Sequence, residues 1–327
     1  MMRSDEQTVV VCAVAGGLLL VLPALLWWSW QEPPMDEEPE MAAQVADVPA
    51  DGDPIDDDKW EQAGEVLAGD VVEDGEEIAS GVFARELPDI ADSPRAMPRD
   101  QILEEFRDKE PTQWGEFVEG VETRLPTSRQ AVALTLDACD RGYDAELIEF
   151  LEEREIPATL FVTGYFADAH PELLERLSDE PLFEIANHGL AHRPCSVTGK
   201  KAAEIEGTGS VEEAYVEIAG NADIIEELTG DRPAFYRSGT AYYDEICTRI
   251  ARRTGHRVAG FDVVGDLGAT YSADQVEEAV TGVEPGSIVV AHMNKPDGGT
   301  REGLKRALPQ LQEDGWAFVR LSDVAWD

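Results

Sequence analysis

The chain has 327 residues, and its 68 acidic side chains outnumber 26 basic ones to give a formal net charge of −42. Such a charge argues against nucleic acids and anionic polymers as partners, because both are bound through lysine and arginine. We interpret the acidic excess as a halophilic adaptation, since molar salt screens charges over about 3 Å. Four cysteines are too few for a disulfide scaffold.

The N-terminal region predicts a membrane anchor. Residues 8–30 carry no charged side chain and are long enough to cross a bilayer as a helix. Arg3 precedes this segment and acidic residues follow it, which by the positive-inside rule leaves residues 1–7 in the cytoplasm. A cleaved signal peptide is the alternative, but it needs a shorter apolar core followed by small residues. We therefore predict a single-pass signal anchor in the cell membrane, with the remainder exported to the cell envelope.

A strongly acidic segment follows the predicted anchor. Residues 31–100 hold 22 acidic and 4 basic side chains and little hydrophobic periodicity. Such a segment cannot bury enough apolar surface to offset its ordering entropy, and like charges extend it. We predict a disordered acidic stalk over residues 31–110 and one folded domain over residues 111–327.

The domain alternates strand and helix patterns. Its first strand lies in Gln130 to Asp140 (QAVALTLDACD), an apolar run that ends on Asp137. Further short apolar runs predict strands at 158–162, 182–186, 234–236, 258–261, 287–291 and 317–321. Helical spacing predicts helices at 144–154, 171–177, 244–253, 273–280 and 301–314, and a long helix between a capping box at Ser210 to Glu213 and Gly230. About seven strands with intervening helices predict an α/β fold with a mainly parallel sheet, either open or closed as a barrel.

Several predicted strands end in side chains that can carry chemistry. These are Asp137 after the first strand, His188 and His192 after the third, Arg237 after the fourth, Asp262 and Asp266 after the fifth, and His292 after the sixth. Three of the five histidines of the chain fall at these positions. Because barrel enzymes assemble their sites at the carboxyl ends of strands, we predict a site there.

The spacing of His188 and His192 predicts a metal site. At i and i+4 on a helical turn both imidazoles would lie on one face, where they can hold one ion. A lone pair of this kind is more often two exposed or core histidines, but here Asp137 and His292 end neighbouring strands. Asn187 is placed to hold a ring nitrogen by a hydrogen bond.

Five motifs in order, TLDACD, NHGLAH, YRSGTAYYD, DVVGD and VVAHMN, resemble the polysaccharide deacetylase family of carbohydrate esterases. The resemblance covers residues 111–327. It implies a distorted (β/α) barrel and a metal-dependent hydrolase that removes N-acetyl or O-acetyl groups from a polysaccharide by acting on carbon–nitrogen bonds other than peptide bonds. The implied partner is an acetylated glycan, the implied cofactor is a divalent metal, zinc in our interpretation, and we expect a monomer.

The resemblance also assigns roles to individual residues. It implies that Asp137 is the catalytic base, that His188 and His192 bind the metal, that Arg237 orients the base, that His292 is the general acid, and that Asp266, or as the second choice Asp262, holds His292 in its tautomer. The backbone around Gly239 and Thr240 would supply an N–H to the oxyanion.

Two positions depart from the family pattern. Ala138 stands where the family carries a second, metal-binding aspartate, and Gly239 and Thr240 replace a usual Pro-Tyr pair. The missing ligand could be supplied by Asp140, by Asp137 itself or by water, since catalytic zinc needs only three protein ligands. The alternative function is a catalytically degenerate domain that serves as a glycan-binding surface module.

Cys139 and Cys195 follow the predicted base and the second histidine, in loops that should lie at one mouth of the barrel. We expect both to be inert and buried, as free cysteines commonly are. A disulfide between them is one alternative. A Cys139 thiolate in place of the missing aspartate is disfavoured, because Cys139 is offset by one residue from the family's ligand position.

Overall fold

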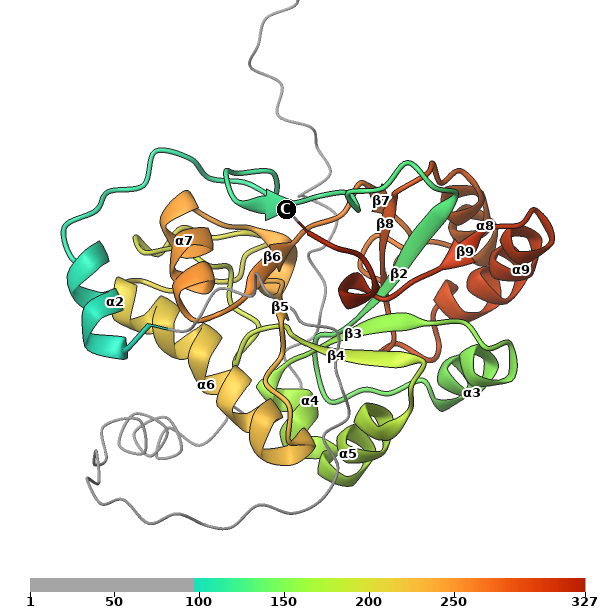
Figure 1. Ribbon diagram of the computed structural model, residues 1–327, viewed down its shortest axis with the longest axis horizontal. Coiled ribbons are helices and arrows are strands. Elements are labelled where there is room, and N and C mark those ends of the chain that lie inside the picture. Colours follow the sequence, from blue (N-terminus) through green and yellow to red (C-terminus); the bar gives the residue numbers. More distant parts are fainter. Residues whose placement is uncertain (1–96, 327) are drawn as a thin grey trace, which may run out of the picture. The chain divides into compact units, whose positions relative to one another are not determined.

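A curled, parallel β-sheet with helices packed around it makes up residues 97–326, the part of the chain that the computed structural model describes (Figure 1). The strands lie in the order β1-β6-β5-β4-β3-β2-β8-β7, and β9 pairs with β2 off this path. They are β1 Val121–Glu122, β2 Ala131–Ala138, β3 Ala158–Val162, β4 Phe183–Asn187, β5 Phe235–Tyr236, β6 Arg257–Ala259, β7 Val263–Val264, β8 Ile288–His292 and β9 Ala317–Phe318. Every pairing between them is parallel. The predicted α/β class with a parallel sheet is therefore confirmed, in the form of a half-barrel consistent with a distorted barrel.

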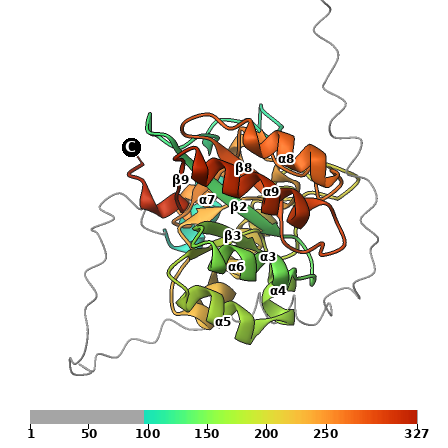
Figure 2. The same cartoon turned by 90° about the vertical axis from the view of Figure 1, so that its right-hand side faces the viewer.

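Helices follow the strands in the predicted alternation. They are α2 Arg99–Phe106, α3 Ala145–Glu153, α4 Gly164–Ala169, α5 Pro171–Asp179, α6 Val211–Thr229, α7 Glu245–Arg253, α8 Ala273–Thr281 and α9 Thr300–Glu313, with short 3-10 turns η2 Gly239–Ala241 and η3 Leu321–Asp323. Figure 2 shows α8 and α9 side by side on one flank of the sheet. A Cβ on Gly303 of α9 would lie 2.4 Å from Val276 Cβ of α8, so only glycine permits this approach.

The N-terminus of α6 corrects one local prediction. Ser210 accepts a hydrogen bond from the backbone N–H of Glu213, as expected of an N-cap. The Glu213 carboxylate, however, accepts from the N–H of Gly209 at 3.0 Å, one residue before the cap. The predicted capping box is therefore half formed, and its second hydrogen bond ties down the preceding loop instead.

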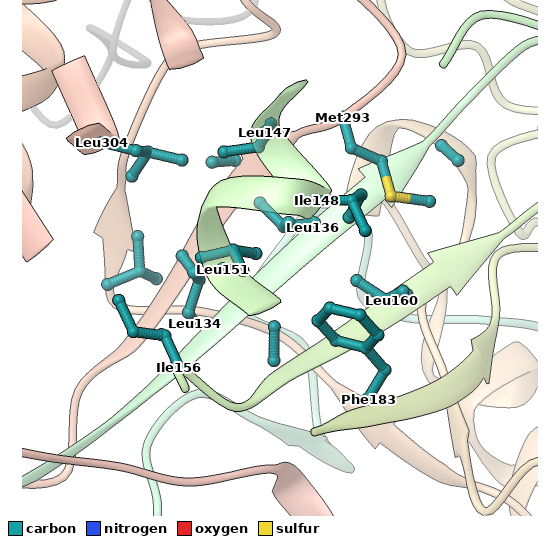
Figure 3. Packing of buried hydrophobic residues seen from close by; sticks show 14 of the residues in the cluster. Leu134, Leu136, Leu147, Ile148, Leu151, Ile156, Leu160, Phe183, Met293 and Leu304 are labelled. Atoms are coloured by element: carbon teal, nitrogen blue, oxygen red, sulfur yellow. The ribbon is translucent and has the colours of Figure 1, made fainter. Parts of the chain in front are cut away.

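Alternate side chains of strand β2 face the hydrophobic core and the candidate site. Leu134 and Leu136 belong to the apolar cluster beneath α3, and Figure 3 shows them facing Leu147, Ile148 and Leu151 of that helix. Burying each such side chain contributes about 1.5–3 kcal/mol. The intervening Thr135 and Asp137 point to the opposite face, where Arg237 contacts both. One strand thus anchors the sheet with one set of residues and presents chemistry with the other.

The domain begins earlier than predicted. Ile102 and Phe106 of α2 are buried in the second apolar cluster of the domain, beside Ile250 of α7. Ile102 and Phe106 are one helical turn apart in an otherwise acidic stretch. This is too little periodicity to predict a helix, so the sequence alone predicts a stalk that extends to residue 110. The two-residue strands β1 and β7 and the one-and-a-half-turn α4 were also missed, since such short elements leave little periodicity. Among residues 97–326 no helix is long and apolar enough to span a membrane, and the predicted anchor at 8–30 and the stalk up to residue 96 lie outside this part.

Candidate active site

The register of the sheet brings the predicted site residues to one edge. Asp137 at the end of β2 is aligned with His292 at the end of β8. Asn187 of β4 is aligned with Tyr236 of β5. The residues that directly follow these two strands, His188 and Arg237, therefore also lie side by side. Parallel strands put all these carboxyl ends on the same side of the sheet, as sites in α/β proteins require.

Arg237 forms a buried ion pair with Asp137 and orients its carboxylate. Its guanidinium is completely buried and donates to Asp137 Oδ1 at 2.7 Å and to Thr135 Oγ1 at 2.9 Å, with further bonds to two backbone carbonyls. Burial alone would raise the pKa of Asp137, but Arg237, with His188 and His292, lowers it below the ordinary value. Asp137 is therefore an ionised carboxylate whose second oxygen faces the histidines.

His188 presents a bare nitrogen to the same point. Its Nδ1 lies 2.9 Å from the Arg237 carbonyl oxygen, which can only accept, so Nδ1 carries the proton. Its Nε2 then offers a lone pair, 3.6 Å from Asp137 Oδ2 and 3.6 Å from Cys139 Sγ. A backbone carbonyl that fixes the tautomer in this way is typical of histidines that ligate metals. Asn187, the predicted holder, bonds instead to the Ile218 carbonyl and His256.

His192 completes the cluster, although the helical turn predicted for this stretch is wrong. Residues 188–193 form an irregular loop in which Gly189 has φ 84° and His192 has φ 57°. The loop is shaped by Glu217 of α6, a buried carboxylate that accepts from the N–H groups of Ala191 and Arg193 at 3.1 and 3.0 Å. The result still sets the rings of His188 and His192 with centroids 5.0 Å apart.

A set of donor atoms suited to a metal ion therefore converges here. The side chains of Cys139, His188 and His192 each offer one ligand atom, and these atoms lie within 4.8 Å of one another. Imidazole and thiolate are the ligands that zinc prefers, and Asp137 is at hand beside them. The residues present thus fit the divalent metal that the motifs imply.

His292 and Asp266 form a second unit beside the cluster. Asp266 Oδ1 accepts from His292 Nδ1 at 2.8 Å, and its other oxygen accepts from the His292 backbone N–H and from Thr300 Oγ1, both at 2.8 Å. Burial would lower the pKa of His292, but Asp266, and after it Cys139, raises that pKa well above its ordinary value. The imidazole is therefore held in its charged form, with Cys139 as a further hydrogen-bond partner of the ring.

Two carboxylates from the predicted set lie elsewhere. Asp262 accepts from the backbone N–H of Ile288 at 2.7 Å and pairs with Arg124, at the opposite end of β8 from His292. Asp140 bonds to Lys295 Nζ at 2.6 Å and to the Gly142 N–H at 2.8 Å. Asp266 is thus the carboxylate at His292, and Asp140 does not join the donor cluster.

The turn after Arg237 approaches the histidine loop closely. A Cβ on Gly239 would lie 2.1 Å from the carbonyl oxygen of His192, so this position accommodates glycine alone. Thr240 and Ala241 then take φ values of 66° and 55°, a left-handed backbone that non-glycine residues adopt at a cost. Strained backbone of this kind clusters at functional sites, and this turn is where the oxyanion donor is expected.

The cysteines correct the expectation of inert burial. Cys195 forms a disulfide with Cys247 of α7, with Cα atoms 5.8 Å apart, which joins the end of the histidine loop to the helix after η2. Cys139 is the free cysteine among residues 97–326, and it sits between the metal-site histidines. The pairing could not be read from the sequence, because Cys247 is 52 residues away from its partner.

Comparison with known proteins finds similarity to deacetylases of polysaccharides. A family model described as polysaccharide deacetylase matches residues 124–259. The peptidoglycan-N-acetylmuramic acid deacetylase of Bacillus subtilis is 26% identical over 210 residues, which cover 62% of this chain and 73% of that protein. The chitooligosaccharide deacetylase of Sinorhizobium fredii is 26% identical over 218 residues, covering 61% and 93%.

Solved structures agree on the fold. A peptidoglycan N-acetylglucosamine deacetylase in complex with a hydroxamate-type benzamide superposes with a TM-score of 0.53 at 25% identity, covering 62% of this chain and 91% of that one. A carbohydrate esterase pseudoenzyme from Bacillus anthracis gives the same TM-score at 18% identity, covering 64% and 70%. Residues 124–259 are similar to the polysaccharide deacetylase family, and the relatives named above are deacetylases of peptidoglycan and chitooligosaccharides.

Proposed function

We propose that this protein is a metal-dependent deacetylase of an N-acetylated, or O-acetylated, polysaccharide. The observation that carries the proposal is the placement of Asp137 between Arg237 and His188, with the His292–Asp266 pair across the strand end. A catalytically degenerate glycan-binding module would not need a base that is kept ionised and an acid that is kept protonated around one point.

Each residue has a step that its environment suits. A divalent metal held by His188 and His192 would supply polarisation of the acetyl carbonyl and a lowered pKa for water. Asp137, ionised and oriented by Arg237, takes the proton of the attacking water. A backbone N–H of the Gly239–Thr240 turn donates to the developing oxyanion. His292, charged through Asp266, gives its proton to the departing amine, which leaves the free amino sugar and acetate.

The remaining features of the proposal concern where the protein works. An uncleaved anchor at residues 8–30 would hold the domain outside the cytoplasm, where peptidoglycan or another envelope polysaccharide is the substrate. The relatives that act on peptidoglycan and chitooligosaccharides support this substrate class. The charge of −42 supports function in high salt.

The test is acetate release from purified protein at high salt, with N-acetylglucosamine oligomers and peptidoglycan as parallel substrates. We expect release that a chelator abolishes and added zinc restores, and a variant Asp137→Asn that binds metal but releases no acetate. Full metal occupancy without acetate from any acetylated glycan would favour the alternative, a degenerate glycan-binding module with the fold of the pseudoenzyme.

A further inference from the structure

We propose that the Cys139 thiolate is the third protein ligand of the metal, so that this chain carries a cysteine–histidine–histidine site where the family pattern has a carboxylate. The inference deepens the proposed function and rests on it only for the presence of a metal. It reverses the expectation that Cys139, one residue past the family's ligand position, would be out of reach.

The alternation of side chains along β2 explains how Cys139 reaches the site although it lies one residue past the family's ligand position. Side chains two residues apart on a strand face the same side, so Cys139 follows Asp137 onto the site face. Ala138 faces the other way, is completely buried in the apolar cluster beneath the helices, and accepts a hydrogen bond from Thr163 through its carbonyl. A carboxylate at position 138 in this backbone would point into that core.

The distances match a ligand pair. Tetrahedral zinc with a nitrogen at about 2.05 Å and a sulfur at about 2.3 Å separates the two ligand atoms by about 3.6 Å. Cys139 Sγ and His188 Nε2 are 3.6 Å apart. A hydrogen bond between the two atoms, or a cation held by both, would each account for this separation.

The other candidates for the vacant position are engaged elsewhere. Asp140 is held by Lys295 on the outer side of the loop. One oxygen of Asp137 is committed to Arg237, and its task as base requires the other to accept a proton. The partners of the Cys139 side chain are histidines of the site, His188 and His292 among them. Among the described residues, the donor cluster that converges on one point is Cys139, His188 and His192.

A thiolate ligand changes which metals the site accepts. Thiolates favour zinc, and cobalt as its spectroscopic substitute, over the hard cations magnesium, calcium and manganese, which prefer oxygen. The site should therefore discriminate against manganese and magnesium more strongly than a site built from one carboxylate and two histidines.

The experiment uses the full chain loaded with cobalt, compared with Cys139→Ser and Cys139→Asp. We expect wild type to bind one cobalt per chain and show the intense near-ultraviolet absorption of thiolate-to-cobalt charge transfer. Cys139→Ser should lose this absorption and bind zinc at least about 100-fold more weakly, since loss of a mere supporting partner already costs 10–100-fold. Cys139→Asp should keep a bound metal without the absorption. Alkylation mapped by peptide mass should show zinc protecting Cys139.

The outcomes separate the inference from the function. Stoichiometric cobalt without charge-transfer absorption, or alkylation of Cys139 unaffected by zinc, would overturn thiolate ligation and leave the proposed deacetylase standing. The absorption without acetate release from any glycan would support the ligand and reject the function. Absence of bound metal in wild type would overturn both, and circular dichroism of the variants checks that they are folded.

Discussion

Two histidines of the domain, His256 and His292, show how differently similar burial can be used. Both are packed into protein, and burial alone lowers the pKa of each. His292 faces the Asp266 carboxylate and ends with its pKa well above the ordinary value. The side chain of His256 bonds to neutral partners, Thr254 and Asn187, and burial together with the positive charge of Arg232 lowers its pKa to about 3. The partner, not the burial, decides whether the ring is charged.

The difference in charge between the two histidines matches their different roles in the fold. Neutral His256 accepts from the amide of Asn187, whose oxygen in turn accepts from the Gly189 N–H at 2.9 Å, so it braces the start of the histidine loop. Charged His292 keeps its ring 16% exposed at the mouth of the site. One ring supports the site without titrating near neutrality, and the other is poised to give up a proton.

The largest effect should come from removing the charged ring. His292→Ala is expected to lower kcat by about 10²–10⁴ with little change in KM, because a general acid acts only in the transition state. Steady-state kinetics on N-acetylglucosamine oligomers measures this. His170→Ala, at a half-buried position between α4 and α5 outside the candidate site, is the control and should leave kcat unchanged. A loss confined to KM would show that His292 binds substrate rather than donating a proton.

A smaller effect should follow from making His292 resemble His256. Asp266→Asn removes the largest of the charges that raise the pKa of His292, so this pKa should fall towards its ordinary value of 6.5, with Cys139 still raising it. Because the acid form is lost tenfold per pH unit above its pKa, the rate at pH 8 should drop by up to about 30-fold while the rate near pH 6 changes less.

The matched control for this variant is Asp262→Asn, whose carboxylate lies at the other end of β8. It should leave the alkaline limb of the pH–rate profile in place. An unshifted limb in Asp266→Asn itself would mean that the limb reports a group other than His292.

The smallest effect concerns stability. Between pH 6.5 and about 3 the unfolded chain protonates His256 while the folded chain does not, so the folded state binds fewer protons and stability falls as the pH is lowered. From pH 7 to pH 5 this one group should cost about 2 kcal/mol. Urea unfolding of wild type and His256→Gln should show the variant losing that much less on acidification. Equal losses in both proteins, or an NMR titration of His256 near pH 6.5, would contradict a neutral buried ring.

Much of this arrangement was readable from local patterns. The apolar run ending on Asp137 fixed a buried strand, and parallel strands necessarily gather their carboxyl ends, so the neighbourhood of Asp137, His188, Arg237 and His292 followed from spacing alone. The choice of Asp266 over Asp262 came from the motif resemblance, and the structure supplies the contact that distinguishes them.

Other parts depended on contacts between distant segments. The conformation of the His192 loop is set by Glu217 of α6, and the partner of Cys195 lies on α7. Neither the Glu217 contact nor the disulfide produces a periodic pattern in the sequence. Cys139 was within reach of sequence reasoning, since the two-residue period of a strand would have placed it beside Asp137. Counting its offset from the motif led to the opposite expectation.

The contact between Gly239 and the His192 carbonyl has a consequence for how this lineage could change. A proline at position 239, as in the usual family pair, would place a Cβ 2.1 Å from that oxygen, so the substitution is barred until the histidine loop moves. The histidine loop in turn is tied to Glu217 and, through Cys195, to α7. The turn at Gly239 and the histidine loop are therefore coupled, because a side chain at position 239 requires the backbone around His192 to move with it.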